Sequence, residues 1–319
     1  MNKHLLTEIE IKNFKCFENF KADGFKKVNL IGGKNNVGKT AFMEALFLNA
    51  CSESISNLLF GLSVIEKNRD ILNICINDKI NIIDLLTTNG SFSIDGVHKI
   101  KFTTNKTALN NDTIEIQLDK NDILNINFNE KISFDNNDKV VFISNFGFTN
   151  NDLKQVYKAV QFQDMDVFLN ECIVDFDDNI SQFKIISDTP YLKRTVNGEY
   201  MELSKFGDGI KHYISIISSL YASKNSYLFI DEIENGIHWT LLDKIWELIL
   251  TISKEQNVQV FATTHSKECI ESYARVSKKL EDEDISFISL YRDEKNNIKS
   301  VILNHQEIKD RIEFGLDNR

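Results

Sequence analysis

The chain has 319 residues, of which 42% are hydrophobic and 26% are charged, and its formal net charge is −10. These values are typical of a soluble protein with one large or two modest domains. The acidic balance argues against a surface that coats nucleic acid, although it allows a local basic patch. No apolar run approaches the length of a membrane span, and the N-terminus alternates apolar and polar residues, so we expect a cytoplasmic protein without a membrane partner.

The cysteines are scattered along the chain and form no CxxC pair. This spacing favours neither a disulfide framework nor a zinc site. We therefore expect all of them to be small core residues. They are Cys16, Cys51, Cys75, Cys172 and Cys269.

The first fifty residues predict two strands, a glycine-rich loop and a helix. The segments EIEIKNFKCF, from Glu8, and KKVNLIGG, from Lys26, concentrate Ile, Val, Leu and Phe as strands do. The run AFMEALFLNA, from Ala41, is almost wholly apolar and predicts a buried helix that starts at the loop.

The middle of the chain predicts a β-rich inserted lobe. Period-two stretches between residues 91 and 148, namely SFSIDGVHKIKFTT, TIEIQLD, ILNINFNEKISF and KVVFIS, are separated by Asn, Asp and Gly clusters. Residues 151–176 have a helical pattern, and further strands are expected around the Asn197-Gly198 turn. No heptad repeat is sustained, so we expect no long coiled-coil arm.

The last third alternates helices and strands. A helix over 209–223, the strand YLFID, a helix over 239–254 and the strand VQVFATT are followed by strands at ISFISLYR and IKSVIL. This alternation predicts an α/β fold with a mainly parallel sheet flanked by helices.

The segment GGKNNVGKT at 32–40 contains the phosphate-binding pattern G-x-x-x-x-G-K-[ST], between a predicted strand and a predicted helix. Its glycines let backbone N–H groups point at phosphate oxygens, and the helix adds its positive end. We expect Lys39 to act catalytically by bridging the β- and γ-phosphates, and Thr40 to ligate Mg²⁺. The predicted ATP-binding residues of this loop are Gly33, Lys34, Asn35, Asn36, Val37, Gly38, Lys39, Thr40 and Ala41.

The strand YLFIDE at 227–232 ends in two acids, which are the groups that a phosphate-binding loop needs to complete a site for Mg²⁺ and ATP. Asp231 is the expected metal partner, directly or through water. Glu232 is the expected general base, or the group that positions the attacking water. The alternative is that these acids are only the exposed end of a strand. The phosphate-binding loop (P-loop) in the same chain argues against this alternative.

A third strand, in VFATTHS, ends in polar residues at what should be the carboxyl edge of the same sheet, where ligands gather. We expect His265 to donate a hydrogen bond to the γ-phosphate and to act catalytically with Glu232. The other histidines are expected to be structural. They are His4, His98, His212, His238 and His305.

These motifs, in this order, resemble the ABC-type ATPases of the RecF, SMC and overcoming-lysogenisation-defect group, especially the small bacterial AAA-15/AAA-21 ATPases. The matching pieces are NFKCF, GGKNNVGKT, KFGDGIK at 205–211, LFIDEIENGIH at 228–238, ATTHS at 262–266 and the terminal EFGLDNR. Residues 50–200 match less clearly. The resemblance implies a single ABC-type head over 1–319, with a P-loop part at 1–60, an insertion at about 61–200 and a closing part at 201–319.

In that family a signature motif at a helix start completes the ATP site of a second subunit. KFGDGIK resembles this motif, which adds Gly207, Asp208 and Gly209 to the expected nucleotide-binding residues. Gly207 stands where the family serine contacts the γ-phosphate, so that hydroxyl is missing. Backbone N–H groups at the helix start can replace it, or Ser204 can if the alignment slips.

The resemblance further implies a Mg²⁺-dependent ATPase that forms a homodimer or higher oligomer around ATP, with Asn235 and Gly236 in a D-loop near the interface. Its stand-alone members suggest control of a separately encoded effector, a nuclease or a toxin, in an anti-phage abortive-infection system. The segment after His265 is too short for the Toprim nuclease domain that some relatives carry.

Two alternatives stay open. A RecF-like DNA repair or maintenance ATPase would need a basic stripe, and the available lysine clusters suit solvated faces better. These clusters are Lys26, Lys27 and Lys34, and Lys278 and Lys279. An ATP-holding module with little turnover would be favoured if Glu232 lay away from the nucleotide. A transporter ATPase fits the IKNF opening and the GDG signature less well.

Overall fold

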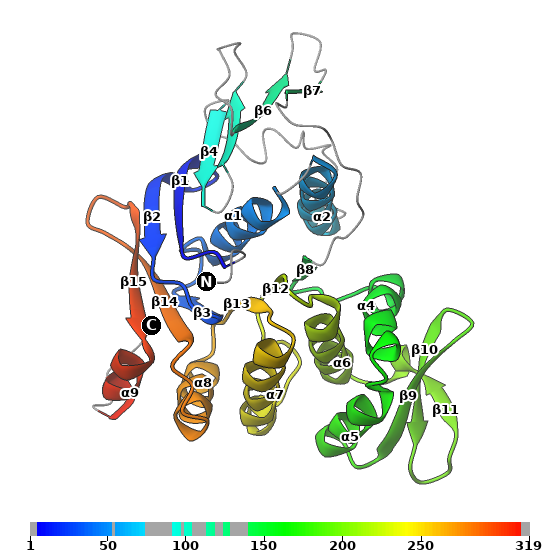
Figure 1. The fold of residues 1–319 in the computed structure, drawn as a ribbon. Helices are drawn as coiled ribbons and strands as arrows, with labels where there is room; N and C mark the ends of the chain where they lie inside the picture. Colours follow the sequence, from blue (N-terminus) through cyan, green and yellow to red (C-terminus); the bar gives the residue numbers. More distant parts are fainter. Residues whose placement is uncertain are drawn as a thin grey trace.

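The computed structural model describes residues 5–52, 55–73, 91–96, 99–103, 113–118, 124–127 and 140–313. A central sheet lies between two layers of helices, and a β-rich lobe stands over one of its faces (Figure 1). Within those ranges, no helix combines the length and the apolar character needed to cross a membrane.

The central sheet has five parallel strands and one antiparallel edge strand, as the alternating pattern predicted. β14, β3, β13, β12 and β8 run parallel, and β15 pairs antiparallel with β14. In spatial order the strands are β15 (Ile298–Asn304), β14 (Ile285–Arg292), β3 (Val28–Gly33), β13 (Gln259–Thr263), β12 (Tyr227–Ile230) and β8 (Val141–Ile143). Its parallel strands bring the carboxyl ends of β3, β12 and β13 to one edge.

Both faces of this sheet are buried at the central strands β3, β12 and β13, which explains why these strands are apolar without strict alternation. On one face Phe229 and Phe261 stack with ring centroids 5.5 Å apart, and Phe47 of α1 (Lys39–Cys51) contacts Phe229 at 5.5 Å. On the other face Leu228 and Val260 belong to the core formed with α6 (Asp208–Ala222), α7 (Leu242–Glu255) and α8 (Lys267–Lys279). The other helices among the described residues are α2 (Ile55–Asn73), α4 (Asn150–Phe162), α5 (Asp166–Phe176), α9 (His305–Glu313), η1 (Leu203–Lys205) and η2 (Trp239–Leu241).

The β-rich lobe extends the N-terminal hairpin. Its sheet runs in the order β2-β1-β4-β5-β6-β7, and a separate antiparallel sheet, β11-β10-β9, lies beside α5 (Figure 1). The lobe strands are β1 (Glu8–Phe14), β2 (Phe17–Asp23), β4 (Ser91–Asp95), β5 (Lys99–Thr103), β6 (Thr113–Leu118) and β7 (Leu124–Asn127). The smaller sheet contains β9 (Ile180–Ile186), β10 (Thr189–Arg194) and β11 (Tyr200–Glu202).

Two strand predictions were wrong. EIEIKNFKCF is not one strand, because Asn13 (φ 54°) and Lys15 (φ 50°) adopt left-handed conformations and turn the chain into the β1–β2 hairpin. Three strands therefore precede the loop. KVVFIS does not belong to the lobe: its strand β8 pairs with β12 of the central sheet. Alternation reports burial but not the pairing partner, so the sequence pattern could not separate these two sheets.

The prediction also missed α8, which lies between β13 and β14. Its exposed face is charged, but Cys269, Ile270, Tyr273 and Val276 form a buried stripe at helical spacing, and Ser266 caps its N-terminus. The expectation for cysteines holds for Cys51, Cys172 and Cys269, which are buried. Cys16 corrects it, because this side chain is exposed in the β1–β2 turn. Cys75 lies outside the described residues.

Candidate nucleotide-binding site

The loop between β3 and α1 has the backbone geometry of a phosphate-binding nest. Gly33, Asn36 and Gly38 all have positive φ values, of 140°, 60° and 111°. A Cβ atom at Gly33 would lie 2.5 Å from the carbonyl oxygen of Leu290, and one at Gly38 would lie 2.9 Å from the Sγ atom of Cys16. Both glycines are therefore required by conformation and by space.

The remaining loop residues differ in exposure. Lys34, Asn35 and Asn36 are exposed at the loop tip, whereas Val37 and Ala41 are buried in the core around α1. Helix α1 starts at Lys39 without a side-chain cap, which leaves its first backbone N–H groups available to a bound anion.

Lys39 lies over the loop that precedes it. Its Nζ atom donates to the carbonyl oxygens of Gly33 (2.7 Å) and Lys34 (3.1 Å), and the side chain is buried. Burial lowers the pKa of Lys39, and the carboxylates of Asp231 and Glu232 oppose that shift. A cationic amine held over this loop by two carbonyl oxygens suits phosphate oxygens.

Asp231 follows β12 and is buried among hydroxyl groups. The Thr40 hydroxyl donates to Asp231 Oδ2 at 3.3 Å, and the Thr263 hydroxyl, from the end of β13, donates to Asp231 Oδ1 at 2.6 Å. Burial raises the pKa of Asp231, and the neighbouring charge of Glu232 raises it further. Parallel strand ends thus bring the P-loop and the acidic motif together.

These residues fit Mg²⁺ bound together with a nucleotide. Thr40 and Asp231 supply the oxygen ligands that Mg²⁺ prefers, and a buried carboxylate beside another acid favours a cation. Among the described residues there is no cluster of three His, Cys, Asp or Glu side chains that could hold a metal without help. Phosphate oxygens would complete the coordination, as in other nucleotide sites.

Glu232 and His265 form a pair at the exposed side of this site. His265 Nε2 lies 3.3 Å from Glu232 Oε1, and about a third of each side chain is exposed. Glu232 has a left-handed backbone (φ 56°), and its N–H group donates to the Thr263 hydroxyl at 2.8 Å. Such a conformation is uncommon for Glu and persists only where the surroundings fix it. Thr263, which orders both acids, was missed by the sequence reasoning.

The predicted signature residues lie against the segment that follows the acidic motif, here termed the D-loop turn (residues 232–237). Asp208 and Gly209 start α6, and the position of a Cβ atom at Gly209 is 1.9 Å from the carbonyl oxygen of Gly236. Gly207, Asp208 and Gly236 are exposed. The Ser204 hydroxyl, the alternative donor, makes a 3.3 Å contact with Glu202.

Comparisons with known proteins show what the chain is similar to. Residues 143–270, which include the acidic motif and His265, match the family of AAA ATPase domains called AAA_15. The chain is 29% identical to a protein of Helicobacter pylori named ATP/GTP phosphatase, over 84% of this chain and 87% of that protein. It is also 33% identical to an uncharacterized protein of Methanocaldococcus jannaschii, over 35% of this chain and 98% of that protein.

Solved structures give the fold. An SMC head bound to the C-terminal winged-helix domain of ScpA has a TM-score of 0.55 at 13% identity, and covers 94% of this chain and 97% of its own. The SMC head of Pyrococcus furiosus, bound to the C-terminal domain of ScpA, has a TM-score of 0.55 at 11% identity, over 97% of this chain and 98% of its own. This chain is an ATPase with the fold of an SMC head.

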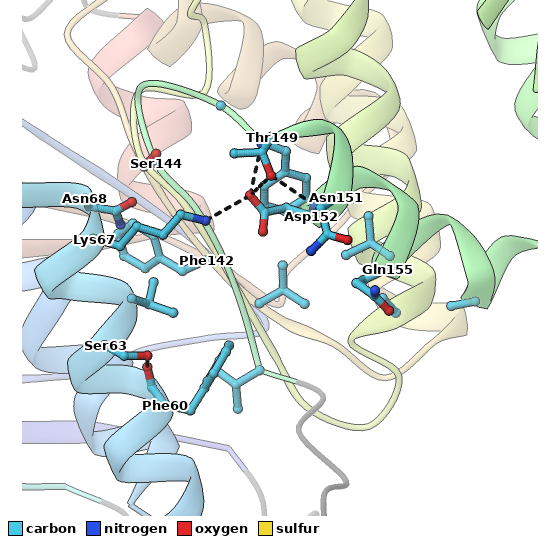
Figure 2. A pocket seen from close by; sticks show the side chains of 18 of the residues that line it. Phe60, Ser63, Lys67, Asn68, Phe142, Ser144, Thr149, Asn151, Asp152 and Gln155 are labelled. Carbon is cyan, nitrogen blue, oxygen red and sulfur yellow. Dashed lines mark hydrogen bonds and ion pairs between the residues drawn. The ribbon is translucent and has the colours of Figure 1, made fainter. Parts of the chain in front are cut away.

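The ATPase also contains a cavity of about 680 Å³ between α2 and α4, beside the edge strand β8. Figure 2 shows that Phe60 and Lys67 reach it from α2, Phe142 from β8, and Asp152 from α4. An ion pair of 3.4 Å joins Lys67 to Asp152 across it. No sequence pattern indicated this cavity, because its walls are far apart in the chain.

Two residues beside this cavity are hydrogen-bonded to the candidate nucleotide-binding site. The Asp231 N–H group donates to the carbonyl oxygen of Ile143 at 2.8 Å. The Asn235 side chain donates to the carbonyl oxygen of Asn145, in the loop between β8 and α4, at 2.6 Å. Strand β8 is thus bonded to the acidic motif, and the loop that follows it is bonded to the D-loop turn.

Proposed function

We propose that this ATPase hydrolyses ATP with Mg²⁺ at a site shared by two copies of the chain, and that nucleotide-controlled association regulates a separate effector protein. In the proposed site Lys39 contacts the phosphates, Thr40 and Asp231 bind the metal, and Glu232 orients and deprotonates the attacking water. His265 donates to the γ-phosphate and orders Glu232.

The observation that carries the hydrolytic role is the contact of Glu232 with His265, next to Asp231 and Lys39. The 3.3 Å contact brings an acceptor and a donor to one side of the loop. A module that only held ATP would not need this pair. Bound Mg²⁺ would offset charge on the phosphate oxygens, while the chain's own residues position the water.

Association of two copies is supported by the exposed surface around the start of α6. Gly207, Asp208 and Gly236 are exposed, and Trp239, just after the D-loop turn, is 65% exposed. The N–H groups at the start of α6, which no side chain caps, are suited to a phosphate. In the ABC-type ATPases that the sequence resembles, the signature motif binds the ATP held by a second subunit. We therefore expect the phosphate at the start of α6 to belong to the ATP of a second copy.

The DNA-acting alternative gains no support from the lysine clusters. Lys27, expected on a solvated face, is buried and donates its Nζ atom to Asn257. Lys279 lies 3.3 Å from Glu247 and is partly neutralised by it. Neither arrangement offers a row of free cations for a phosphate backbone.

Replacing Glu232 tests the hydrolytic role. We expect Glu232→Gln to lower the rate of ATP hydrolysis at least about 100-fold while ATP binding persists, because the amide cannot accept the proton of the water. Phosphate release and binding of a fluorescent ATP analogue measure the two effects. Glu271→Gln, which changes a half-exposed acid of α8, should retain the wild-type rate.

Two results would contradict this proposal. If the wild type released no phosphate from ATP or GTP with Mg²⁺, the hydrolytic role would be wrong. If Glu232→Gln hydrolysed ATP at the wild-type rate, Glu232 would not be the base. Removal of divalent ions by EDTA should stop hydrolysis, since Asp231 and Thr40 would lose the cation that joins them to phosphate.

The anti-phage role rests on the resemblance to stand-alone ATPases of this group. It predicts that cells carrying the gene and its neighbours resist phage infection, and that Glu232→Gln alters this resistance. Plating efficiency measures the effect. Equal plaque numbers with and without these genes, across a broad phage panel, would count against a defence function.

A further inference from the structure

We propose that Glu234 is a positioning residue that connects the D-loop turn to His265; this inference rests on the hydrolytic role proposed above. Glu234 lies outside every motif position to which the sequence assigned a role. Its Oε1 atom accepts hydrogen bonds from two consecutive backbone N–H groups, those of His265 at 2.7 Å and Ser266 at 3.1 Å. One carboxylate oxygen thus fixes the backbone on which the His265 side chain is mounted.

The backbone on either side of His265 is already restrained. The Thr264 N–H group donates to the carbonyl oxygen of Ile31, next to the P-loop, at 3.0 Å. Ser266 caps α8 by accepting from the Cys269 N–H group at 3.1 Å. Glu234 supplies the restraint at His265 itself, and a charged acceptor at the start of α8 is favoured by the helix dipole.

Glu234 also belongs to a well-ordered turn. Its carbonyl oxygen accepts from the Ile237 N–H group at 3.0 Å, and the Asn235 N–H group donates to the carbonyl oxygen of Glu232 at 2.9 Å. Gly236 of this turn packs on Gly209 at the start of α6. A second copy that contacted this surface would therefore reach the His265 backbone through one side chain.

The second oxygen of Glu234 supports a role beyond capping a helix. Oε2 is buried, and no described group hydrogen-bonds to it. A buried acceptor without a partner costs stability, and such costs are tolerated where a site requires the group. Glu268, in the first turn of the same helix, is exposed and accepts from the Ser266 hydroxyl at 2.8 Å, so it offers a control carboxylate on the same turn.

Steady-state kinetics of Glu234→Ala and Glu234→Gln test this proposal. For Glu234→Ala we expect kcat for ATP to fall about tenfold or more, with KM within about twofold, because His265 is displaced while the phosphate loop is intact. Glu234→Gln should retain kcat within about threefold, since its amide oxygen can accept both N–H groups. Glu268→Ala, the matched control, should behave as the wild type.

The proposal is overturned if Glu234→Ala retains the wild-type kcat, or if Glu234→Gln loses as much activity as Glu234→Ala. Melting temperatures and binding of the fluorescent ATP analogue confirm that each variant folds. If Glu234→Ala does not fold, Glu234→Asp replaces it, because its shorter side chain cannot span the same gap. An inactive Glu232→Gln beside a fully active Glu234→Ala would reject this inference and leave the hydrolytic role intact.

Discussion

His212 is a buried polar residue that joins α6 to the end of β12. Its Nε2–H group donates to the carbonyl oxygen of Ile233 at 3.2 Å, and only 6% of the residue is exposed. Burial lowers the pKa of His212 to about 4, against the weaker opposing effect of the hydrogen bond. The expectation that this histidine is structural agrees with its surroundings.

This residue predicts a pH-dependent stability. Between pH 4 and 6.5 the unfolded chain binds a proton at His212 that the folded chain does not, so stability falls as pH falls through this window. We expect the wild type to lose about 2 kcal/mol between pH 7.5 and 5, relative to a neutral His212→Gln variant. Urea unfolding of both proteins at the two pH values measures this difference. Parallel losses in both would contradict it.

At the scale of elements, the start of α6 and the D-loop turn touch through two glycines. A Cβ atom at Gly209 would lie 1.9 Å from the backbone oxygen of Gly236, and the backbone of the turn cannot yield as a flexible side chain would. The contact therefore sets the distance between the signature residues and the acidic motif, which the sequence spacing alone does not specify.

Substitution of Gly209, with its neighbour Gly207 as a control, should separate the effect of packing on stability from the effect of helix propensity. Alanine favours a helix by about 1 kcal/mol over glycine, but the overlap at Gly209 should cost about 1–3 kcal/mol, so Gly209→Ala is expected to destabilise. Gly207→Ser adds a Cβ atom where no atom lies within 4 Å, and serine suits this N-cap position of α6. This substitution should change the free energy of unfolding by only about a few tenths of a kcal/mol. Urea unfolding compares them, and equal stabilities would refute the contact.

At the scale of the whole molecule, its two tryptophans distinguish the core from the proposed association surface. Trp246 of α7 is fully buried, whereas Trp239 is 65% exposed beside the D-loop turn. If a second copy covers the start of α6 and this turn, Trp239 becomes shielded while Trp246 is unaffected.

Acrylamide quenching of tryptophan fluorescence measures this shielding. In the Glu232→Gln background, which should trap bound ATP, we expect ATP and Mg²⁺ to lower the quenching constant and to double the mass in light scattering. Trp239→Phe should abolish the change in quenching but not the change in mass. A doubled mass with unchanged quenching would place the interface elsewhere.

The P-loop, the acidic motif and the order of helices and strands could be predicted from the sequence because they are local. A short pattern of glycines, a lysine and a threonine specifies a loop between a strand and a helix, and apolar runs specify buried elements. The sequence also predicted that Lys39, Asp231 and His265 lie at one edge of the central sheet, because parallel strands place their carboxyl ends together.

Tertiary structure alone decided which strands share a sheet and which groups orient the catalytic candidates. β8 pairs with β12 although its pattern equals that of the lobe strands, because pairing depends on partners distant in sequence. The left-handed backbone of Glu232, the Thr263 hydroxyl that serves two acids, and the carboxylate of Glu234 under His265 arise from such contacts. The sequence pattern does not predict these contacts, because they join the segment after β12 to the end of β13, about thirty residues away.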